Sequence, residues 1–389
     1  MDLLNYGAAL RSSRESNPAS IPQVLITAAA GLGATDVTLY LVDYSQTTLE
    51  PLHDNSPHAD LSSREDVATT MPGRAFRDQR VITAERGDDI RVWVPVIEGS
   101  NKTGVLALTL TTFDERVSLA CEELGMLAGY LLAALARYTD VYNLYRRRKH
   151  MSLAASMQWD LLPPLAMTTH QVSFVGIVEP AYDVGGDCFD YAVNGNTFDF
   201  AIMDAVGHGV ASSMIASLAM GSYRHDRREG SSLTTIHTNL DRLIRSQLPA
   251  VSFATGLLGR LALETGTLSW TNAGHPLPLL IRGGSVVKVL QCRPTPPWGV
   301  AAAPPQMATE MLEPGDHVLA YTDGVTEART QSGDELGTER FIEMVNNCAS
   351  DLLRPQAVLQ TLVNGVRMHL GSEPRDDATI MLIAWAGPS

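Results

Sequence analysis

The sequence has little cysteine and no long apolar run. Its four cysteines lie far apart, with no Cys-x-x-Cys spacing, at Cys121, Cys188, Cys292 and Cys348. That pattern favours a reducing compartment and argues against a structural zinc site. The longest apolar stretches, 128–136 and 378–386, fall short of the roughly 20 residues that span a bilayer. No basic segment followed by an apolar one occurs at the start of the chain, so a signal peptide is not expected.

Positive charge is also scarce. The chain has 29 Lys and Arg against 43 Asp and Glu, a formal net charge of −14, and a pI near 5.1. This surplus of negative charge argues against broad binding to nucleic acid or to an anionic membrane. With 389 residues, 45% hydrophobic and 19% charged, the composition is that of a globular protein of two or three domains. A cytoplasmic protein without a membrane span is therefore expected.

Residues 20–116 have the pattern of a small α/β unit. A capping box with proline in the first turn predicts a helix that begins at Ser20 and ends near Gly33. A strand is predicted over 36–43, and two more over 92–97 and 104–110, joined by a short polar turn. These elements predict an antiparallel sheet flanked by helices.

A helical pattern then runs from a capping box at Thr112 to Leu162, where Pro163 and Pro164 end it. Apolar residues alternate at spacings of three and four along it, at Leu124, Leu127, Leu131, Ala134, Tyr138, Val141 and Tyr145. One interpretation is a single helix packed between domains. The favoured one is a parallel dimer stalk that joins a sensor to an effector. The basic run 146–149 is interpreted as a solvated helix face.

From 171 to 385 the pattern changes to short β-like runs with two helices, over 211–228 and 233–248. The candidate strands are 198–203, 254–263, 266–271, 277–281, 317–321 and 379–385. Two helices among many strands predict an α+β fold built on antiparallel sheet.

Acidic residues occupy the ends of these strands. Asp187 follows two glycines, Asp204 and Asp323 each follow an apolar strand, and Asp376 and Asp377 precede the last strand. If that strand runs antiparallel to the other two, all these carboxylates meet at one sheet edge. Clustered carboxylates need a cation, and an oxygen-only ligand set favours Mg²⁺ or Mn²⁺. A pair of such ions can hold a hydroxide and clamp a phosphoryl group.

Residues 166–387 resemble the PPM-type metal-dependent serine/threonine protein phosphatases, in their bacterial SpoIIE/RsbU-like branch. The matching segments have the order and spread of that family, and they are 179–190, 204–209, 253–255, 272–276, 321–327 and 375–379. Residues 20–137 are similar to a GAF sensor domain, on strand–helix order and on Val94-Pro-Val96 followed by Gly104-Val-Leu106. The resemblance implies an α+β chain with a GAF-like α/β sensor (1–115), a long helical linker and dimer stalk (116–165), and a phosphatase β-sandwich flanked by helices (166–389).

The resemblance also implies roles for residues. Asp204 would bridge two Mn²⁺ or Mg²⁺ ions, and the Ala205 carbonyl would contact one of them. Asp323 and Asp376 would hold one ion, and Asp187 would serve the other directly or through water. Asp376 is favoured over Asp377. Attack by a hydroxide held between the metals on a phosphoserine or phosphothreonine would complete the reaction.

Further implications concern partners. The substrate would be a phosphorylated anti-sigma-factor antagonist of STAS type, the chain would form a homodimer through the linker helix, and the GAF-like domain would take a small-molecule or protein signal. The competing class is a catalytically silent phosphatase fold that docks a partner. A two-metal phosphodiesterase or nuclease is disfavoured by the net charge of −14.

Three residues near the predicted cluster have alternative roles. His208 lies between two glycines, where it either donates a proton to the leaving oxygen or fills a structural slot at a helix start, and the structural role is favoured. His275 is expected to be a turn or hydrogen-bonding residue. Cys188 is expected to be a small buried filler rather than a redox-sensitive thiol.

Overall fold

The computed structural model describes residues 4–388 except 53–62, 180, 181, 184, 250, 294, 331, 332, 349–354 and 371–376. The chain divides into two compact units, 1–150 and 151–389, which are described separately. Of the predicted linker, α4 (Glu115–Leu135) and α5 (Val141–Arg146) belong to the first unit, and α6 (Leu153–Leu161) belongs to the second. The boundaries of three functional domains, at 115 and 165, stay a prediction.

The first unit is built on one six-stranded antiparallel sheet in the order β3-β2-β1-β6-β5-β4. The strands are β1 Asp36–Val42, β2 Thr48–Pro51, β3 Glu65–Asp66, β4 Ile82–Arg86, β5 Asp89–Glu98 and β6 Asn101–Leu110. The helices are α1 Tyr6–Glu15, α2 Ile21–Ala29, α3 Met71–Asp78, α4 Glu115–Leu135 and α5 Val141–Arg146. The predicted antiparallel sheet flanked by helices is confirmed.

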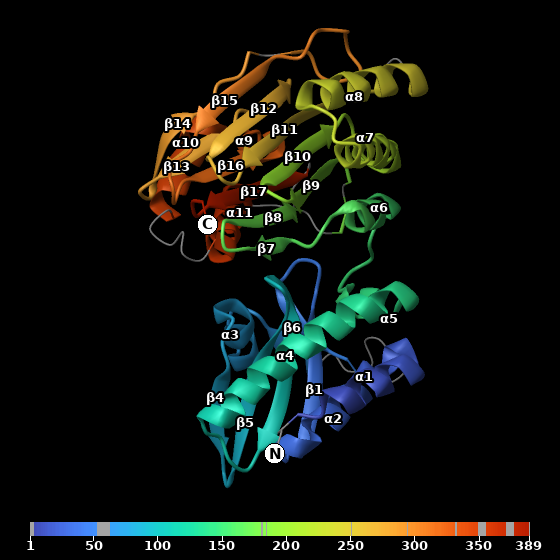
Figure 1. Cartoon of the computed structure of the whole chain (residues 1–389), viewed down its shortest axis with the longest axis vertical. Coiled ribbons are helices and arrows are strands. Elements are labelled where there is room, and N and C mark those ends of the chain that lie inside the picture. The colour runs from blue at the N-terminus through green and yellow to red at the C-terminus, as the bar shows by residue number, and fades with distance from the viewer. Residues whose placement is uncertain are drawn as a thin grey trace. The chain divides into compact units, whose positions relative to one another are not determined.

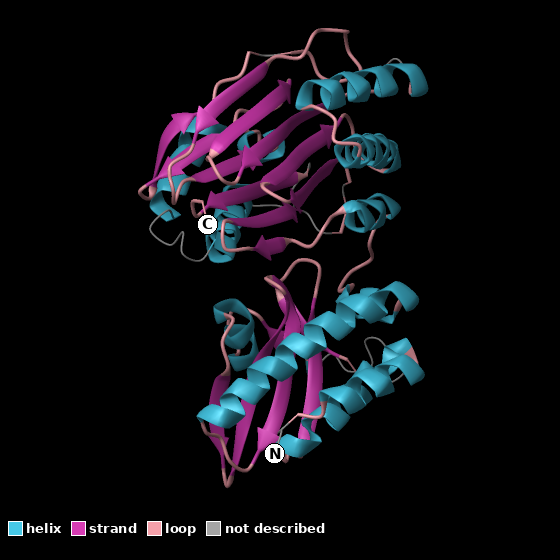
Figure 2. Cartoon of the chain, viewed as in Figure 1, coloured by secondary structure: helices cyan, strands magenta, loops and turns pink. Residues whose placement is uncertain are grey.

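Helices cover both faces of this sheet. The larger core cluster joins α2 and α4 to apolar residues of β1, β5 and β6. A smaller cluster on the opposite face contains Phe76 of α3, Val42 and Val105. Figures 1 and 2 show α1, α2 and α4 on the near side of the sheet. The first unit therefore buries a core on each face of its sheet.

The prediction of one unbroken helix from the capping box at Thr112 to Leu162 is wrong. α4 ends at Leu135, and a 3₁₀ turn, Ala136–Tyr138, follows. Thr139 is extended, α5 covers only Val141–Arg146, and α6, Leu153–Leu161, begins after an extended segment. Contacts within the first unit explain the break: the Tyr142 hydroxyl donates to the Pro18 carbonyl. Arg146 stacks on Tyr44, 4.4 Å from the ring centroid, and its Nε donates to the Val42 carbonyl at 3.1 Å.

The second unit is a β-sandwich flanked by helices, as the resemblance implied. One sheet has the order β15-β12-β11-β10-β9 and the other β14-β13-β16-β17-β8-β7. Its strands are β7 Ala166–Thr168, β8 Val172–Glu179, β9 Asp187–Asn194, β10 Thr197–Ala205, β11 Ala254–Ala262, β12 Thr267–Ala273, β13 Leu279–Arg282, β14 Ser285–Val289, β15 Met307–Met311, β16 His317–Tyr321 and β17 Ala378–Trp385. Figure 2 shows the two layers of strands with helices outside them.

Three apolar layers hold the sandwich together. The inner faces of the two sheets bury Phe174, Phe200 and Trp270. A second layer packs the first sheet against α7 Val210–Arg228 and α8 Leu233–Gln247. The third packs the other sheet against α10 Gly337–Cys348 and α11 Pro355–Leu370. α9, Asp323–Thr326, is a short helix directly after β16.

One long apolar helix belongs to the first unit. By length and composition, Glu115–Tyr138 is long and apolar enough to cross a membrane, with 44% of its most apolar window buried. Gly125 and Gly129 explain this burial, because a Cβ there would lie 2.4 Å from the Pro95 carbonyl oxygen and 2.0 Å from that of Ile97. The helix backbone therefore lies directly on β5, and the buried face of α4 is the core of the first unit.

Candidate active site

Asp187 and Asp204 lie opposite each other on neighbouring strands. In the antiparallel pair of β9 and β10, Asp204 is the partner of Asp187. Asp187 begins β9, and only 2% of its surface is exposed, whereas Asp204 is half-buried near the end of β10. The register therefore places two of the predicted metal ligands side by side.

The prediction that all the acidic residues meet at one sheet edge is wrong in one respect. β10 lies in one sheet, whereas β16 and β17 pair antiparallel in the other. The acidic residues therefore come from both layers of the sandwich, and the loop before β9 connects them. Its Gly186 lies against Ala205, because a Cβ there would be 2.9 Å from the Ala205 carbonyl oxygen.

Thr322 connects the second sheet to Asp187. Its hydroxyl donates to Asp187 Oδ2 at 2.6 Å, and it accepts the Thr379 backbone N–H at 2.9 Å. Asp323 follows Thr322 directly and is the first residue of α9. Gly324 is required here, because a Cβ would lie 1.9 Å from the Asp377 carbonyl oxygen. The end of β16 and the start of β17 thus meet next to Asp187.

Asp377 is buried and holds the loop that carries Asp187. Its Oδ2 accepts the backbone N–H groups of Gly186 at 2.7 Å and of Asp187 at 3.1 Å, and the Gln158 side chain at 3.1 Å. Gln158, on α6, also donates to the Asp187 carbonyl at 2.8 Å. Asp376, the favoured ligand of the pair, lies outside the described residues, so its role stays a prediction.

Burial and like charges make Asp187 difficult to ionise. Burial is the largest cause that raises the pKa of Asp187 well above its ordinary value, and the charges of Asp204 and Asp377 raise it further. The hydrogen bond from Thr322 offsets part of this effect. Such a carboxylate is stabilised by a nearby cation, and its oxygen-only surroundings suit Mg²⁺ or Mn²⁺. The chemistry of the donors therefore fits the two metals that the resemblance implied.

The complete metal site is not assembled among the described residues. Over the parts of the chain that the structure describes, no group of three acidic, histidine or cysteine side chains could hold an ion. Strand pairing places Asp204 beside Asp187, and Asp377 accepts the Asp187 backbone N–H. Asp323 is connected to this group only through its neighbour Thr322, which donates to Asp187. The predicted ligand set of Asp187, Asp204, Ala205, Asp323 and Asp376 stays a prediction.

The two histidines and Cys188 have different surroundings. His208 is exposed between Gly207 and Gly209, which have φ values of 87° and 77°, at the start of α7. His275 is buried, and its Nδ1 lies 2.9 Å from the hydroxyl of Thr255, which faces Asp204 across β10 and β11. Burial lowers the pKa of His275 to about 3, so this side chain is neutral, as expected for a hydrogen-bonding residue.

Cys188 is fully buried, as predicted for a small filler. Burial raises the pKa of its thiol, and the charge of Asp187 adds to this effect. A protonated thiol is a poor nucleophile, so Cys188 does not add a reactive group to the site.

Sequence reasoning missed the contribution of α6. Leu153 at the start of this helix is 64% exposed, and its buried face is Ala154, Ala155 and Gln158. A single glutamine in an apolar helix gives little indication that it contacts a functional site. Thr322, by contrast, lies directly before Asp323, and a hydroxyl at that position is a signal that could have found it.

Residues 194–386 match the family model of Stage II sporulation protein E (SpoIIE). With the β-sandwich and the acidic residues at its strand ends, this match identifies the second unit as a phosphatase domain of the SpoIIE, PP2C type. The match begins at residue 194, so the resemblance of the first unit to GAF domains stays a prediction.

Two curated proteins and one solved structure are similar to the chain. Protein IcfG of Synechocystis sp. is 24% identical over 266 residues, which are 61% of this chain and 41% of that protein. Phosphoserine phosphatase RsbU of Bacillus subtilis is 22% identical over 226 residues, 54% of this chain and 66% of that protein. The SiaA-PP2C domain of Pseudomonas aeruginosa matches with a TM-score of 0.51 and 23% identity, over 60% of this chain and 94% of that domain, which shows the fold. The chain thus spans less than two thirds of the length of both curated relatives.

Proposed function

We propose that this chain is a metal-dependent protein serine/threonine phosphatase that hydrolyses a phosphoserine or phosphothreonine on a regulatory protein. The observation that carries the proposal is the buried Asp187 beside Asp204, within a domain of the SpoIIE type. A buried carboxylate next to a second one is costly without a cation. This pair of carboxylates supports the proposal of a cation site, because packing alone gives no reason to bury one of them beside the other.

Asp187, Asp204, Asp323, Asp376 and the Ala205 carbonyl would hold two divalent cations, Mn²⁺ or Mg²⁺. When bound, these ions would neutralise the carboxylates and the phosphoryl group and activate a water for in-line attack. Other side chains of the protein would orient the Asp187 carboxylate toward the ions. Thr322 fixes Asp187 Oδ2, and Asp377 and Gln158 hold the backbone on which Asp187 lies. Asp377 Oδ2 already accepts three donors, and the resemblance favours Asp376 as the ligand of the pair.

Substrate, regulation and location follow from the same resemblance. We propose a phosphorylated STAS-type anti-sigma-factor antagonist as the substrate, cytoplasmic action and a homodimeric state. Control would pass from the first unit through α6 to the Asp187 loop, because Gln158 touches that loop directly. A small-molecule or protein signal at the first unit would start this control.

The second candidate is a catalytically silent phosphatase fold that docks a partner. The acidic residues weigh against it, because a docking module has no need for buried carboxylates whose charges oppose one another. The two candidates differ in one property, which is hydrolysis.

The test is hydrolysis of p-nitrophenyl phosphate and of a phosphoserine protein with Mn²⁺, by the parent chain and by Asp204→Ala. Loss of a group that holds the ions should lower kcat/KM by at least about 100-fold, more than changes outside the ligand set usually cost. Glu264→Ala, an exposed acid in the turn after β11 at the opposite end of the sheet from Asp204, is the matched control and should keep full activity. Full activity in Asp204→Ala, or no hydrolysis by the parent with any divalent metal, would contradict the proposal.

A further inference from the structure

Two of the segments that resemble the phosphatase family have no role in the site described above. They are 253–255, which includes Thr255 near the start of β11, and 272–276, which covers the end of β12 and a turn that contains His275. The structure brings the two segments together, because Nδ1 of His275 lies 2.9 Å from the Thr255 hydroxyl. Both segments therefore contribute to one hydrogen bond, and its place in the sheet indicates what it does.

Thr255 lies in a row with two of the predicted metal ligands. Asp204 is the strand partner of Asp187 on one side and of Thr255 on the other. Side chains directly opposite each other in antiparallel strands lie on the same face of the sheet, with Cβ atoms about 4.5–5.5 Å apart. The Thr255 side chain therefore lies beside the Asp204 carboxylate, and His275, which is 5% exposed, lies beside Thr255.

The turn that carries His275 is held without its imidazole. The Asn272 side chain accepts the His275 backbone N–H at 2.8 Å and donates to the His275 carbonyl at 2.8 Å. Gly274, which has a φ of 64°, supplies the backbone conformation that the turn requires. Burial of a polar ring costs free energy unless the ring is hydrogen-bonded. Formation of the turn therefore does not explain the buried imidazole, whereas its contact with Thr255 does.

The imidazole fixes the direction of the Thr255 hydroxyl. Burial lowers the pKa of His275 to about 3, so the ring is neutral at pH 7 and carries one proton. Nδ1 then either accepts the hydroxyl proton or donates to the hydroxyl oxygen, and either bond restricts rotation of the hydroxyl. A restricted hydroxyl beside Asp204 limits the positions that the carboxylate can take. Contacts of this kind orient metal ligands in proteins.

We propose that His275 is a positioning residue that orients the Asp204 carboxylate through the hydroxyl of Thr255. The inference rests on the metal-dependent function proposed above, and it concerns two residues outside the predicted ligand set. A purely structural histidine has a different consequence, because its loss would lower the melting temperature and leave the affinity for metal unchanged.

The experiment measures the Mn²⁺ dissociation constant of the full chain by titration calorimetry without substrate, so the readout does not depend on hydrolysis. Thr255→Val and His275→Leu should each raise this constant by about tenfold or more, as for other residues that orient ligands. Thr255→Ser keeps the hydroxyl and should bind Mn²⁺ as the parent does. His275→Asn keeps a polar group near the position of Nδ1 and should retain part of the affinity. In the double variant the two losses should not add, because both act through one hydrogen bond.

Thr271→Val is the matched control for a buried pair of histidine and threonine. The Thr271 hydroxyl lies 3.2 Å from Nδ1 of the buried His237. The strand partners of Thr271 are Leu258 and Met307, so no acidic residue lies opposite it. This variant should keep the Mn²⁺ affinity of the parent, even where its melting temperature falls.

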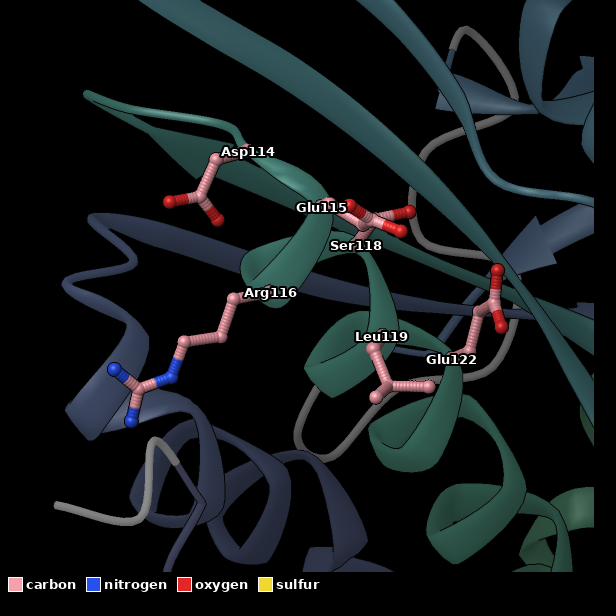
Figure 3. Close-up of a pocket in the computed structure, with 6 residues that line it drawn as sticks. All are labelled: Asp114, Glu115, Arg116, Ser118, Leu119 and Glu122. Carbon is pink, nitrogen blue, oxygen red and sulfur yellow. The ribbon is translucent and has the colours of Figure 1, made fainter.

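A second control accounts for Mn²⁺ that binds to surface carboxylates. Such carboxylates line an open pocket at the first turns of α4, formed by Asp114, Glu115, Arg116, Ser118, Leu119 and Glu122 (Figure 3). The double variant Glu115→Gln with Glu122→Gln should leave the Mn²⁺ dissociation constant of the second unit unchanged.

Asp204→Ala, measured in parallel, separates this inference from the proposed function. If Asp204→Ala weakens Mn²⁺ binding and Thr255→Val does not, the metal site stands and His275 is not a positioning residue. Additive losses in the double variant would contradict the inference in the same way. If the parent binds no Mn²⁺, or Asp204→Ala binds it as tightly as the parent, the proposed metal site is wrong and so is the inference. Should His275→Leu unfold, Thr255→Val decides the question, because valine has nearly the shape of threonine.

Discussion

At the scale of single residues, the second unit buries an uncharged histidine, His237. His237 on α8 has both ring nitrogens near hydroxyls, with Nδ1 3.2 Å from Thr271 Oγ1 and Nε2 3.5 Å from Thr295 Oγ1. Its ring also packs edge-on against Trp298. Burial lowers the pKa of His237 to about 4. The folded chain therefore holds this histidine neutral at pH values where the unfolded chain protonates it.

This difference predicts a pH dependence of stability. The unfolded histidine has a pKa near 6.5, so between pH 6.5 and 4 the unfolded state binds more protons, and the free energy of unfolding falls as the pH is lowered. From pH 7 to pH 5, the loss from His237 should be about 2 kcal/mol. His237→Gln keeps a hydrogen-bonding group but cannot be protonated, so its stability should fall less over the same range. Urea unfolding followed by tryptophan fluorescence at both pH values measures the difference.

The control for this experiment is His225→Gln, because His225 is exposed on α7. It should keep the pH dependence of the parent chain. If His237→Gln lost as much stability between pH 7 and pH 5 as the parent, the buried neutral histidine would not be the cause.

The acidic residues show how far sequence reasoning reaches at the residue scale. The strand-end positions of Asp187, Asp204 and Asp323 were read from the sequence, and the register of β9 and β10 agrees for the first two. The role of Asp377 was not predictable, because it depends on backbone N–H groups of a loop 190 residues away in the chain. Motif spacing identifies which acidic residues are candidate metal ligands. Tertiary contacts decide which of their carboxylate oxygens already accept hydrogen bonds.

At the scale of elements, strands were predicted better than helix ends. β16 has the predicted bounds of 317 and 321, and β17 begins one residue before the predicted 379, because alternation and apolar runs mark buried strands. α10 and α11 were missed, although the buried Leu359, Leu362 and Val366 of α11 have helical spacing. The capping box at Thr112 was also misplaced, since Asp114 and not Thr112 caps α4. Local patterns identify an element more reliably than they locate its end.

The element that connects most directly to the candidate site is α6. Besides Gln158, the Ser152 backbone N–H donates to the Tyr182 carbonyl at 2.9 Å. The Ser213 hydroxyl of α7 lies between the carbonyls of Ala154 and Gly185, and Arg224 of α7 donates to the Leu161 carbonyl at 2.6 Å. α6 is thus fixed to both the Asp187 loop and α7, so a displacement of α6 would move the backbone that holds Asp187.

A substitution in α6 should therefore change metal binding. Gln158→Ala removes a donor to Asp377 and to the Asp187 carbonyl, which loosens the loop without removing a predicted ligand. The Mn²⁺ concentration for half-maximal phosphatase activity should rise by about 10-fold or more, as for other residues that orient ligands. Activity at saturating Mn²⁺ should change much less. The measurement is a Mn²⁺ titration of p-nitrophenyl phosphate hydrolysis.

Gln247→Ala serves as the control, because Gln247 is exposed at the end of α8. Its Mn²⁺ requirement should equal that of the parent. An unchanged Mn²⁺ requirement in Gln158→Ala would show that α6 does not position Asp187.

At the scale of the whole molecule, the basic segment predicted as a solvated helix face has two parts. Arg146 packs on Tyr44, and Arg148 donates to the hydroxyls of Thr47 and Thr48 on the first unit. Lys149 and His150 are exposed at the division between the units. The seam of a continuous stalk was not realised because Tyr142 and Tyr145 are buried in the core of the first unit. The sequence could not show this, since an apolar residue at helical spacing fits a coiled coil and a domain core equally well.

This division predicts that the two units are stable separately. Each has its own buried core, so the chain between Lys149 and His150 should tolerate cleavage. A specific protease site inserted there should yield two fragments that keep their helical and strand content, measured by circular dichroism after separation. Metal-dependent hydrolysis should remain with the fragment that begins at residue 150, and mass measurements should find the proposed homodimer in the fragment that carries α4 and α5 of the predicted linker. Dimerisation by the C-terminal fragment alone would instead place the association in the phosphatase unit.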